Sequence, residues 1–412
     1  MESLSEKLKS LGVQIGAQGL ESPQPKREFR VEEVIEGHDV ETNLGRVFVV
    51  DNILKQGYEH GVIQLCANHL HETLAIMGNN EAFSRLDRQN IVFIDAETTS
   101  LAGGAGTFAF MVGLGFYEQD NFRVIQLFLR DPSEELAFLS VLGSYIERFN
   151  GVVSYNGKSF DIPLLNNRHV IHSLPSPFTQ TSHLDLLHMA RKLWRNRLTS
   201  RSLKDIEVEI LHTSRTIDEV PGWLVPQIYF DYLQSGDARP LAGVFYHNRM
   251  DIVSLAALYV YLCGILNEPL TNPLTHFLDL IEIGSLYEQM GNSERAVKLY
   301  EQCLQNGLPR QSFLNVLLKY AFLYRKKGDW LTALPFWEKA AELQHVDSCI
   351  ELAKYYEHHE RDIVSALTWT EHALTNLASL DITKSSKKLL EKNLEHRRAR
   401  LSRKSEKQSQ GK

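Results

Sequence analysis

Cysteine is scarce in this chain of 412 residues. The four that occur are widely separated: Cys66, Cys263, Cys303 and Cys349. None of their spacings suits a zinc site, and so few cysteines do not form the disulfide framework of a small secreted protein. We therefore expect a protein of a reducing compartment, and assign it to the cytoplasm.

Long hydrophobic runs are also missing. The longest nearly unbroken run, Ile252 to Leu266, has 15 residues, fewer than the roughly 18 to 20 that span a bilayer. The first ten residues, MESLSEKLKS, carry acidic side chains and lack the apolar centre of a secretory signal. The long run is therefore predicted to be a buried helix, and no membrane association is expected.

The chain has no excess of positive charge, because its net charge is −7. Charge is unevenly distributed, however. From Thr383 to Lys412 there are 11 Lys or Arg and 3 Glu, a balance of +8, which leaves −15 for residues 1 to 382. This basic tail, residues 381–412, is either a solvated, partly helical extension or an auxiliary phosphate-binding arm.

The pattern along the chain indicates an α/β domain followed by helices. Residues 1–88 read as a small β-containing region with a strand in GRVFVVDNIL. In residues 89–268, the strand IVFIDAE precedes a hairpin from Gly106 to Asp131, a helix that begins at Ser133 and a further strand, GVVSYNG. Strands that alternate with helices in this way predict an α/β domain.

Residues 273–380 show a helical period with an internal repeat. Ala296, Ala333 and Ala366 are 37 and 33 residues apart, and each is followed seven positions later by a small residue. Small residues at fixed positions allow stacked helices to approach closely. The segments resemble tetratricopeptide repeats, through which a protein partner is expected to bind, with a generic helical bundle as the alternative.

The strand IVFIDAE ends on two acids. Side chains alternate along a strand, so Asp95 and Glu97 point to the same side of the sheet. Two like charges held together take up a proton or attract a cation. A divalent metal would resolve the repulsion, although a strand that simply runs out into solvent is the alternative.

Further acids occur where other apolar elements end. Asp161 lies at the start of a predicted helix, where it also suits an N-cap. Asp251 lies at the polar end of the long apolar helix, four residues after His247, so the two share a helix face. His and Asp at this spacing are compatible with a surface pair as well as with a metal site.

Three motifs, FIDAETTSL, SYNGKSFDIPLL and YHNRMDIVSL, resemble those of the DEDD 3′→5′ exonucleases of the RNase H-like superfamily, most closely the YprB-like branch with tetratricopeptide-like repeats. The resemblance implies a mixed five-stranded sheet flanked by helices, followed by an all-α repeat domain. It also implies two divalent ions, Mg²⁺ or Mn²⁺, which would stabilise the attacking and leaving oxygens of a phosphodiester. The implied ligands are Asp95, Glu97, Asp161 and Asp251.

The resemblance also suggests residues that act on the water and the substrate. One family subgroup has histidine five residues before the last aspartate and another has tyrosine four before it, whereas here Tyr246 and His247 exchange these positions. Helix geometry favours His247 as the group that faces the metals. Expected substrate contacts are Thr98, Thr99, Leu101 and Asn156.

A basic segment surrounds Trp194. Arg191, Arg195 and Arg197 flank the indole in ARKLWRNRLTSRSLK, and cations with an aromatic ring suit a single-stranded end. The alternative is a solvated helix face with Trp194 in the core. Asp185, which precedes this segment, is expected to cap its helix rather than to bind metal.

The leading functional hypothesis is a metal-dependent 3′→5′ exonuclease acting on the single-stranded 3′ end of DNA or RNA. An RNase H-like endonuclease is the second possibility, because the same metal chemistry can cut internally. A non-catalytic nucleic-acid-binding scaffold built on the helical repeats is the third. The complete set of four carboxylates argues against the scaffold.

Overall fold

The structure is a computed structural model, and it describes residues 29–67, 70–100, 106–215, 219–305, 307–380 and 383–410. The chain divides into two compact units. Within the described residues, the first comprises 29–58, 88–181 and 213–256, and the second comprises 59–87, 182–212 and 257–410. Each unit is described by itself below.

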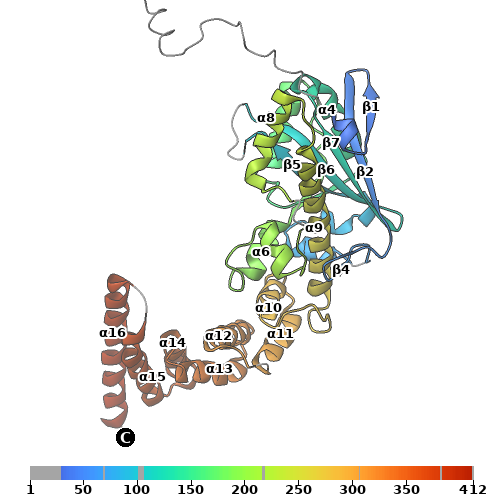
Figure 1. Ribbon diagram of the computed structural model, residues 1–412. Coiled ribbons are helices and arrows are strands. Elements are labelled where there is room, and N and C mark those ends of the chain that lie inside the picture. The colour runs from blue at the N-terminus through green and yellow to red at the C-terminus, as the bar shows by residue number, and fades with distance from the viewer. Residues whose placement is uncertain are drawn as a thin grey trace, which may run out of the picture. The chain divides into compact units, whose positions relative to one another are not determined.

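The first unit is built on a mixed sheet (Figure 1). Its strands are β1 (His38–Thr42), β2 (Gly45–Leu54), β5 (Ile91–Thr98), β6 (Ala109–Glu118), β7 (Asn121–Phe128) and β8 (Gly151–Ser154). With β9 (Ser182–Asp185), the strand order is β1-β2-β7-β6-β5-β8-β9. The first five strands in this order pair antiparallel, and β8 pairs parallel with β5.

The helices of the first unit are α2 (Val31–Val34), α4 (Glu135–Ile146), α5 (Asp161–Ile171), α8 (Val225–Ser235) and most of α9 (Leu241–Asn267). The α8 helix is held to the sheet by Tyr229, whose ring stacks on Phe110 with centroids 4.1 Å apart. The Tyr229 hydroxyl also donates a hydrogen bond to the carbonyl of Leu129, at 3.0 Å. Among the described helices, α9 alone is long and apolar enough to cross a membrane, and 83% of its most apolar window is buried inside the protein.

Two glycines let α9 lie close to the sheet. A Cβ atom at Gly113 would lie 2.4 Å from Asn248 Oδ1, and one at Gly115 would lie 2.5 Å from Ile252 Cγ2. Both distances are shorter than any van der Waals contact. Because residues two apart on a strand share a face, β6 presents a flat surface to α9 at these two positions.

The observed sheet corrects the predicted number of strands. It has seven strands rather than five, because β1 and β2 join it through the antiparallel pairing of β2 with β7. The domain boundaries at residues 88 and 268 stay predictions, and the compact units group the residues as follows. Residues 38–54 belong with the sheet, whereas residues 59–87 and 182–212 belong with the helical C-terminal part.

The second unit is largely helical. It contains the hairpin of β3 (Glu59–His60) with β4 (Ile63–Gln64), and the helices α3 (Glu72–Met77), α6 (Leu186–Trp194) and α7 (Leu203–Glu209). Then follow α10 (Asp279–Gln289), α11 (Ser293–Gln305), α12 (Arg310–Lys326), α13 (Trp330–Glu342), α14 (Val346–Tyr355), α15 (Ile363–Asn376) and α16 (Lys384–Gln410).

The predicted helical repeats are present as helix pairs. α10 packs on α11, α12 on α13, and α14 on α15. The three repeat alanines and the small residues seven positions after them are all completely buried: Ala296, Cys303, Ala333, Ala340, Ala366 and Ala373. The helical character of this region is thus confirmed, while its tetratricopeptide identity and its protein partner stay predictions.

The close packing at Gly113 is tested by comparing two glycine-to-alanine substitutions. We expect Gly113→Ala to lower the free energy of unfolding by about 1 to 3 kcal/mol, because the added methyl group overpacks the contact with α9. Gly143→Ala is the control, since Gly143 lies within α4 and its added Cβ would meet nothing within 4 Å. It should instead stabilise the protein by about 1 kcal/mol. Denaturant titration measures both, and equal effects would contradict the packing argument.

Candidate metal centre

Four carboxylates from three separate elements gather on one face of the sheet. β5 provides Asp95 and Glu97, α5 begins with Asp161, and α9 carries Asp251. Burial raises the pKa of Asp95 well above its usual value, and the charges of Asp251, Glu97 and Asp161 raise it further. The pKa of Glu97 is raised to about 8, first by burial and then by the charges of Asp251 and Asp161. The predicted acids therefore lie close enough to repel one another.

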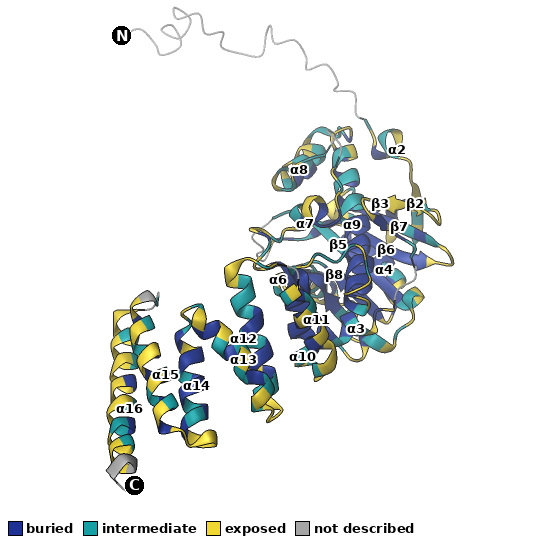
Figure 2. Ribbon diagram, turned by 90° about the horizontal axis from the view of Figure 1, so that it is seen from below, coloured by how far each residue is buried: buried dark blue, intermediate teal, exposed yellow. Residues whose placement is uncertain are grey.

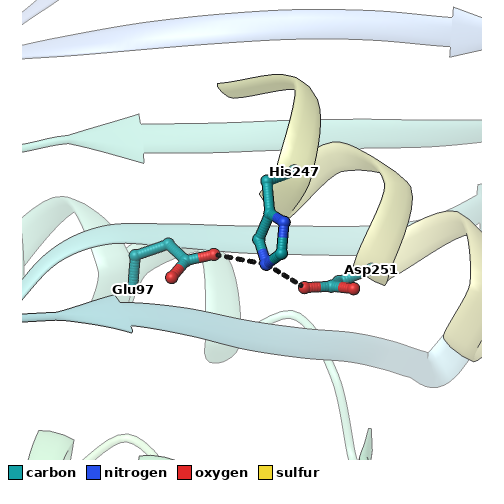
Figure 3. A group of neighbouring side chains, drawn as sticks. All are labelled: Glu97, His247 and Asp251. Atoms are coloured by element: carbon teal, nitrogen blue, oxygen red, sulfur yellow. Dashed lines mark ion pairs between the residues drawn. The ribbon is translucent and has the colours of Figure 1, made fainter. Parts of the chain in front are cut away.

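His247 lies between two of these acids (Figure 3). Its Nε2 is 3.3 Å from Asp251 Oδ2 and 3.9 Å from Glu97 Oε1. One ligand atom from each of these three residues lies within 4.8 Å of the others, which suits a common metal ion. The side chains are only 12% to 15% exposed. The (i, i+4) spacing that predicted a shared helix face for His247 and Asp251 therefore holds in the structure.

The turn that leads to Asp161 depends on one left-handed backbone position and on one glycine in a confined space. Asn156 has a positive φ of 68°, and a Cβ atom at Gly157 would lie 2.6 Å from Ser154 Oγ and 3.0 Å from Asp161 Oδ2. A larger residue at position 157 would therefore push the carboxylate away. Asp161 is the first residue of α5, and Phe160 occupies the cap position that Asp161 was also expected to suit.

A cation already lies among the acids, and sequence reasoning missed it. Arg215 is 5% exposed and forms an ion pair with Asp251. Its guanidinium also contacts Glu219 Oε1 at 3.2 Å and His247 Nδ1 at 3.3 Å. Nδ1 of His247 also lies 3.6 Å from Glu219 Oε1. This ring nitrogen therefore faces both a guanidinium and a carboxylate, while Nε2 faces Asp251 and Glu97.

Asn248 fixes the orientation of Asp95. Its Nδ2 donates to Asp95 Oδ2 at 3.0 Å, while Gln126 Nε2 donates to Asn248 Oδ1 at 3.0 Å and to the carbonyl of Phe245 at 2.8 Å. Both amide side chains are buried. Gln126 thereby determines which end of the Asn248 amide faces the carboxylate. Groups behind a ligand orient it in this way in many metal sites.

The two threonines that follow Glu97 are half-buried and bonded to nearby backbone. Thr98 Oγ1 donates to the carbonyl of Ser100 at 3.0 Å, and Thr99 Oγ1 accepts from the Phe108 amide at 3.2 Å. The pairing of β5 with β6 has a bulge at Glu97 and Thr98, a feature often found beside functional sites. Leu101, also predicted as a substrate contact, lies outside the described residues.

The predicted base-stacking role of Trp194 is wrong. Its indole is completely buried in the second unit, and its Nε1 donates to Asp279 Oδ2 at 3.2 Å. Arg197 also pairs with Asp279, at 2.6 Å, and Arg195 lies 3.6 Å from Glu282. The apolar side of α6, which includes Trp194, packs against the interior of this unit. Arg191 is exposed, and Asp185 caps α6 as expected.

Tyr246 directly precedes His247 on α9 and is half-buried. It lines a cavity of about 270 Å³ with Asn52, Gln126 and Arg249, and the Arg249 guanidinium lies 5.7 Å from the centre of its ring.

Comparison with known proteins agrees with this geometry. Residues 92–263 match the RNase H superfamily, and this span includes all four carboxylates and His247. Over 341 residues the chain is 33% identical to "Uncharacterized protein YprB" of Bacillus subtilis (strain 168), covering 81% of this chain and 78% of that protein. The chain belongs to the YprB family. Its RNase H-like fold, predicted from three short motifs, is thereby confirmed.

Among solved structures, the family B DNA polymerase from the hyperthermophilic archaeon Pyrobaculum calidifontis is similar with a TM-score of 0.35 and 14% sequence identity. The alignment covers 56% of this YprB family member and 29% of the polymerase.

The donor set fits a hard divalent cation. Carboxylate oxygens are the preferred ligands of Mg²⁺ and Mn²⁺. Burial and the neighbouring carboxylates raise the pKa values of Asp95 and Glu97, although Arg215 acts to lower that of Glu97. Asp95, Glu97, Asp161 and Asp251 would hold such ions, with His247 beside them.

Arg215 and a metal ion should compete for Asp251. We expect Arg215→Gln to bind Mn²⁺ roughly tenfold more tightly, which corresponds to the loss of about 1.4 kcal/mol of competing ion pairing. The metal-free variant should also unfold at a lower temperature, because its acids then lack their counter-charge. Calorimetric titration and thermal unfolding measure the two effects.

Arg239→Gln is the matched control, since it removes an equal charge from an exposed pair with Asp237. It should change neither quantity. Weaker Mn²⁺ binding by Arg215→Gln would show that the guanidinium supports the metal site and does not compete for it.

Proposed function

We propose that this YprB family member is a metal-dependent 3′→5′ exonuclease that hydrolyses phosphodiester bonds at nucleic-acid ends. The observation that carries the proposal is the meeting of four half-buried carboxylates on one face of an RNase H-like sheet. The order and sequence of the three motifs favour end trimming over internal cutting.

The chemistry requires compensation of negative charge on the attacking and leaving oxygens. Two bound divalent cations would supply it and would favour ionisation of the attacking water. The chain's own part is to hold the carboxylates rigidly: the β5 backbone spaces Asp95 and Glu97, and Asn248 keeps Asp95 in one orientation. A preorganised site of this kind needs no rearrangement at the moment of reaction.

His247 is proposed to take the proton of the attacking water through Nε2. Neutral imidazole accepts a proton near physiological pH. Nε2 faces Glu97 and Asp251, so a water among these groups would be within its reach. Glu219 Oε1, 3.6 Å from Nδ1, can accept a hydrogen bond from that nitrogen, which would leave the lone pair of Nε2 to act as the base.

End-labelled oligonucleotides of DNA and RNA, incubated with Mn²⁺, test the proposal. A ladder of products shortened one nucleotide at a time from the 3′ end is expected. Internal fragments would instead identify an endonuclease, and intact oligonucleotides that are nevertheless bound would favour a non-catalytic scaffold. The same assay also distinguishes DNA from RNA.

Removal of any one ligand charge should abolish hydrolysis while the fold remains. The variants are Asp95→Asn, Glu97→Gln, Asp161→Asn and Asp251→Asn, each expected to lose a factor of at least about 10² in rate, because the metal is displaced. Asp120→Asn is the control, since Asp120 lies exposed in the turn between β6 and β7. Full activity in one of the four would remove that residue from the site.

Two substitutions test whether His247 or Tyr246 acts on the attacking water. His247→Ala should slow single-turnover hydrolysis by about 10² to 10⁴, the usual contribution of a general base. Tyr246→Phe should have near-normal rates, because Tyr246 lines a separate cavity. Rates are measured at saturating Mn²⁺, with metal affinity determined in parallel. A large loss for Tyr246→Phe with a normal His247→Ala would reverse the assignment.

A further inference from the structure

The C-terminal helix α16 packs on the repeats along one narrow side. Leu394 and Leu401 are buried, at 3% and 0% exposure, and α16 contacts α15. Figure 2 shows most of the remaining surface of α16 as exposed. The apolar contact that holds the helix is therefore narrow. The charged residues of α16 indicate its further role.

A buried carboxylate anchors the inner side of α16. Glu357, in a π-helical turn from Tyr356 to Glu360, has a completely buried side chain. It pairs with Arg400 at 2.5 Å, with Lys404 at 3.0 Å and with Arg397 at 3.4 Å. Although burial opposes its ionisation, these partners, Lys404 and Arg400 foremost, lower the pKa of Glu357. Three cations of the tail are thus used to fix the helix in place.

The outer side of α16 carries a second set of cations. At 100° per residue, five of them fall within about 140° of one another, and each is at least about 80° away from Leu394 and Leu401. All five are exposed: Lys384, Lys388, Lys392, Arg403 and Lys407. We call this set the outer stripe. Among the described residues, none of its members forms an ion pair with a carboxylate.

The length and charge of the outer stripe suit a polyanion. From Lys384 to Lys407 it extends about 35 Å at 1.5 Å per residue, the length of about ten nucleotides at 3.4 Å each. Glu395 and Glu406 also lie on this side of the helix, so five cations less two carboxylates leave +3. This net positive charge lies along a single helix.

Solubility does not explain such a tail. Residues 1 to 382 carry −15, and the +8 of the tail brings the chain to −7. Solubility improves as net charge moves away from zero, whereas this tail moves it closer to zero. The tail also contains three cations that pair with the buried Glu357 and five exposed cations that, among the described residues, pair with no carboxylate, a division that a solvated extension does not require.

We propose that the outer stripe binds the phosphate backbone of nucleic acid and gives the protein a second, sequence-independent contact with its substrate. This inference rests on the proposed function, since it takes the substrate to be a nucleic acid. Lysine and arginine bind phosphates by releasing counterions, so the contact must weaken as salt increases.

The test uses the full chain with Asp161→Asn, which binds without cutting. In the stripe variant, the five cations of the outer stripe are replaced by Gln. In a control variant, five exposed cations of the repeat helices are replaced by Gln: Lys298, Arg310, Lys326, Lys327 and Lys339. Binding of a fluorescent single-stranded oligonucleotide is measured between 50 and 200 mM salt, without divalent ions. Thermal unfolding verifies that both variants are folded.

The stripe variant should bind at least tenfold more weakly at the lowest salt. Its slope of log affinity against log salt should fall by about 0.7 for each stripe cation that contacts a phosphate. The control variant should lose less than threefold. An unchanged slope in the stripe variant, or an equal loss in the control, would overturn the proposal.

Two further outcomes separate the alternatives. If a polyglutamate peptide displaces the oligonucleotide from the stripe as effectively as unlabelled oligonucleotide does, the surface recognises acidic protein and the proposal fails. If the unmutated chain cuts no oligonucleotide while the stripe variant still loses its salt slope, the proposed nuclease function fails and the stripe remains a nucleic-acid contact.

Discussion

The close approach of α9 to β6 is the constraint on which the candidate site depends. Only glycine at positions 113 and 115 leaves room for Asn248 and Ile252. Because Asp95 pairs directly with Gly113 across the strands, the helix that fills this space lies over the end of β5. Its next polar residues, His247 and Asp251, then meet Glu97. Close backbone packing therefore determines where the charged groups meet.

This packing concentrates negative charge that the protein alone does not balance. Asp95 and Glu97 both hold protons more tightly than isolated carboxyl groups do, and burial is the largest cause. Arg215 supplies one counter-charge through its ion pair with Asp251, and its guanidinium also contacts Nδ1 of His247. One buried cation thus touches both polar residues that α9 contributes to the cluster.

Local periodicity accounts for what the sequence revealed of this site. The period of two placed Asp95 and Glu97 on one face, and the spacing of four joined His247 to Asp251. Periodicity gives no information about contacts between distant segments. It therefore did not predict the pairing of β2 with β7 or the hydrogen bond from Gln126 to Asn248, 122 residues away. Arg215 follows no pattern at all. The six small repeat residues were visible because stacked helices require them at regular spacing.

Residue type alone misled in the basic segment. An aromatic side chain among arginines is compatible with stacking on a base or with packing in a core, and the amphipathic side of α6 selects the core for Trp194. Arg197 then pairs with the same buried Asp279 that binds the indole. Basic residues on α16 differ because their inner and outer sides carry separate sets of cations. Which partner a cation meets, rather than its frequency in the sequence, indicates its role.

A crystal structure of the protein soaked in Mn²⁺ tests the central claim most directly. Anomalous scattering locates manganese independently of any assumption about function. The account predicts manganese peaks among Asp95, Glu97, Asp161 and Asp251, with the Arg215 guanidinium moved away from Asp251. Saturating Mn²⁺ with no peak at these carboxylates, and with Arg215 still paired to Asp251, would contradict it.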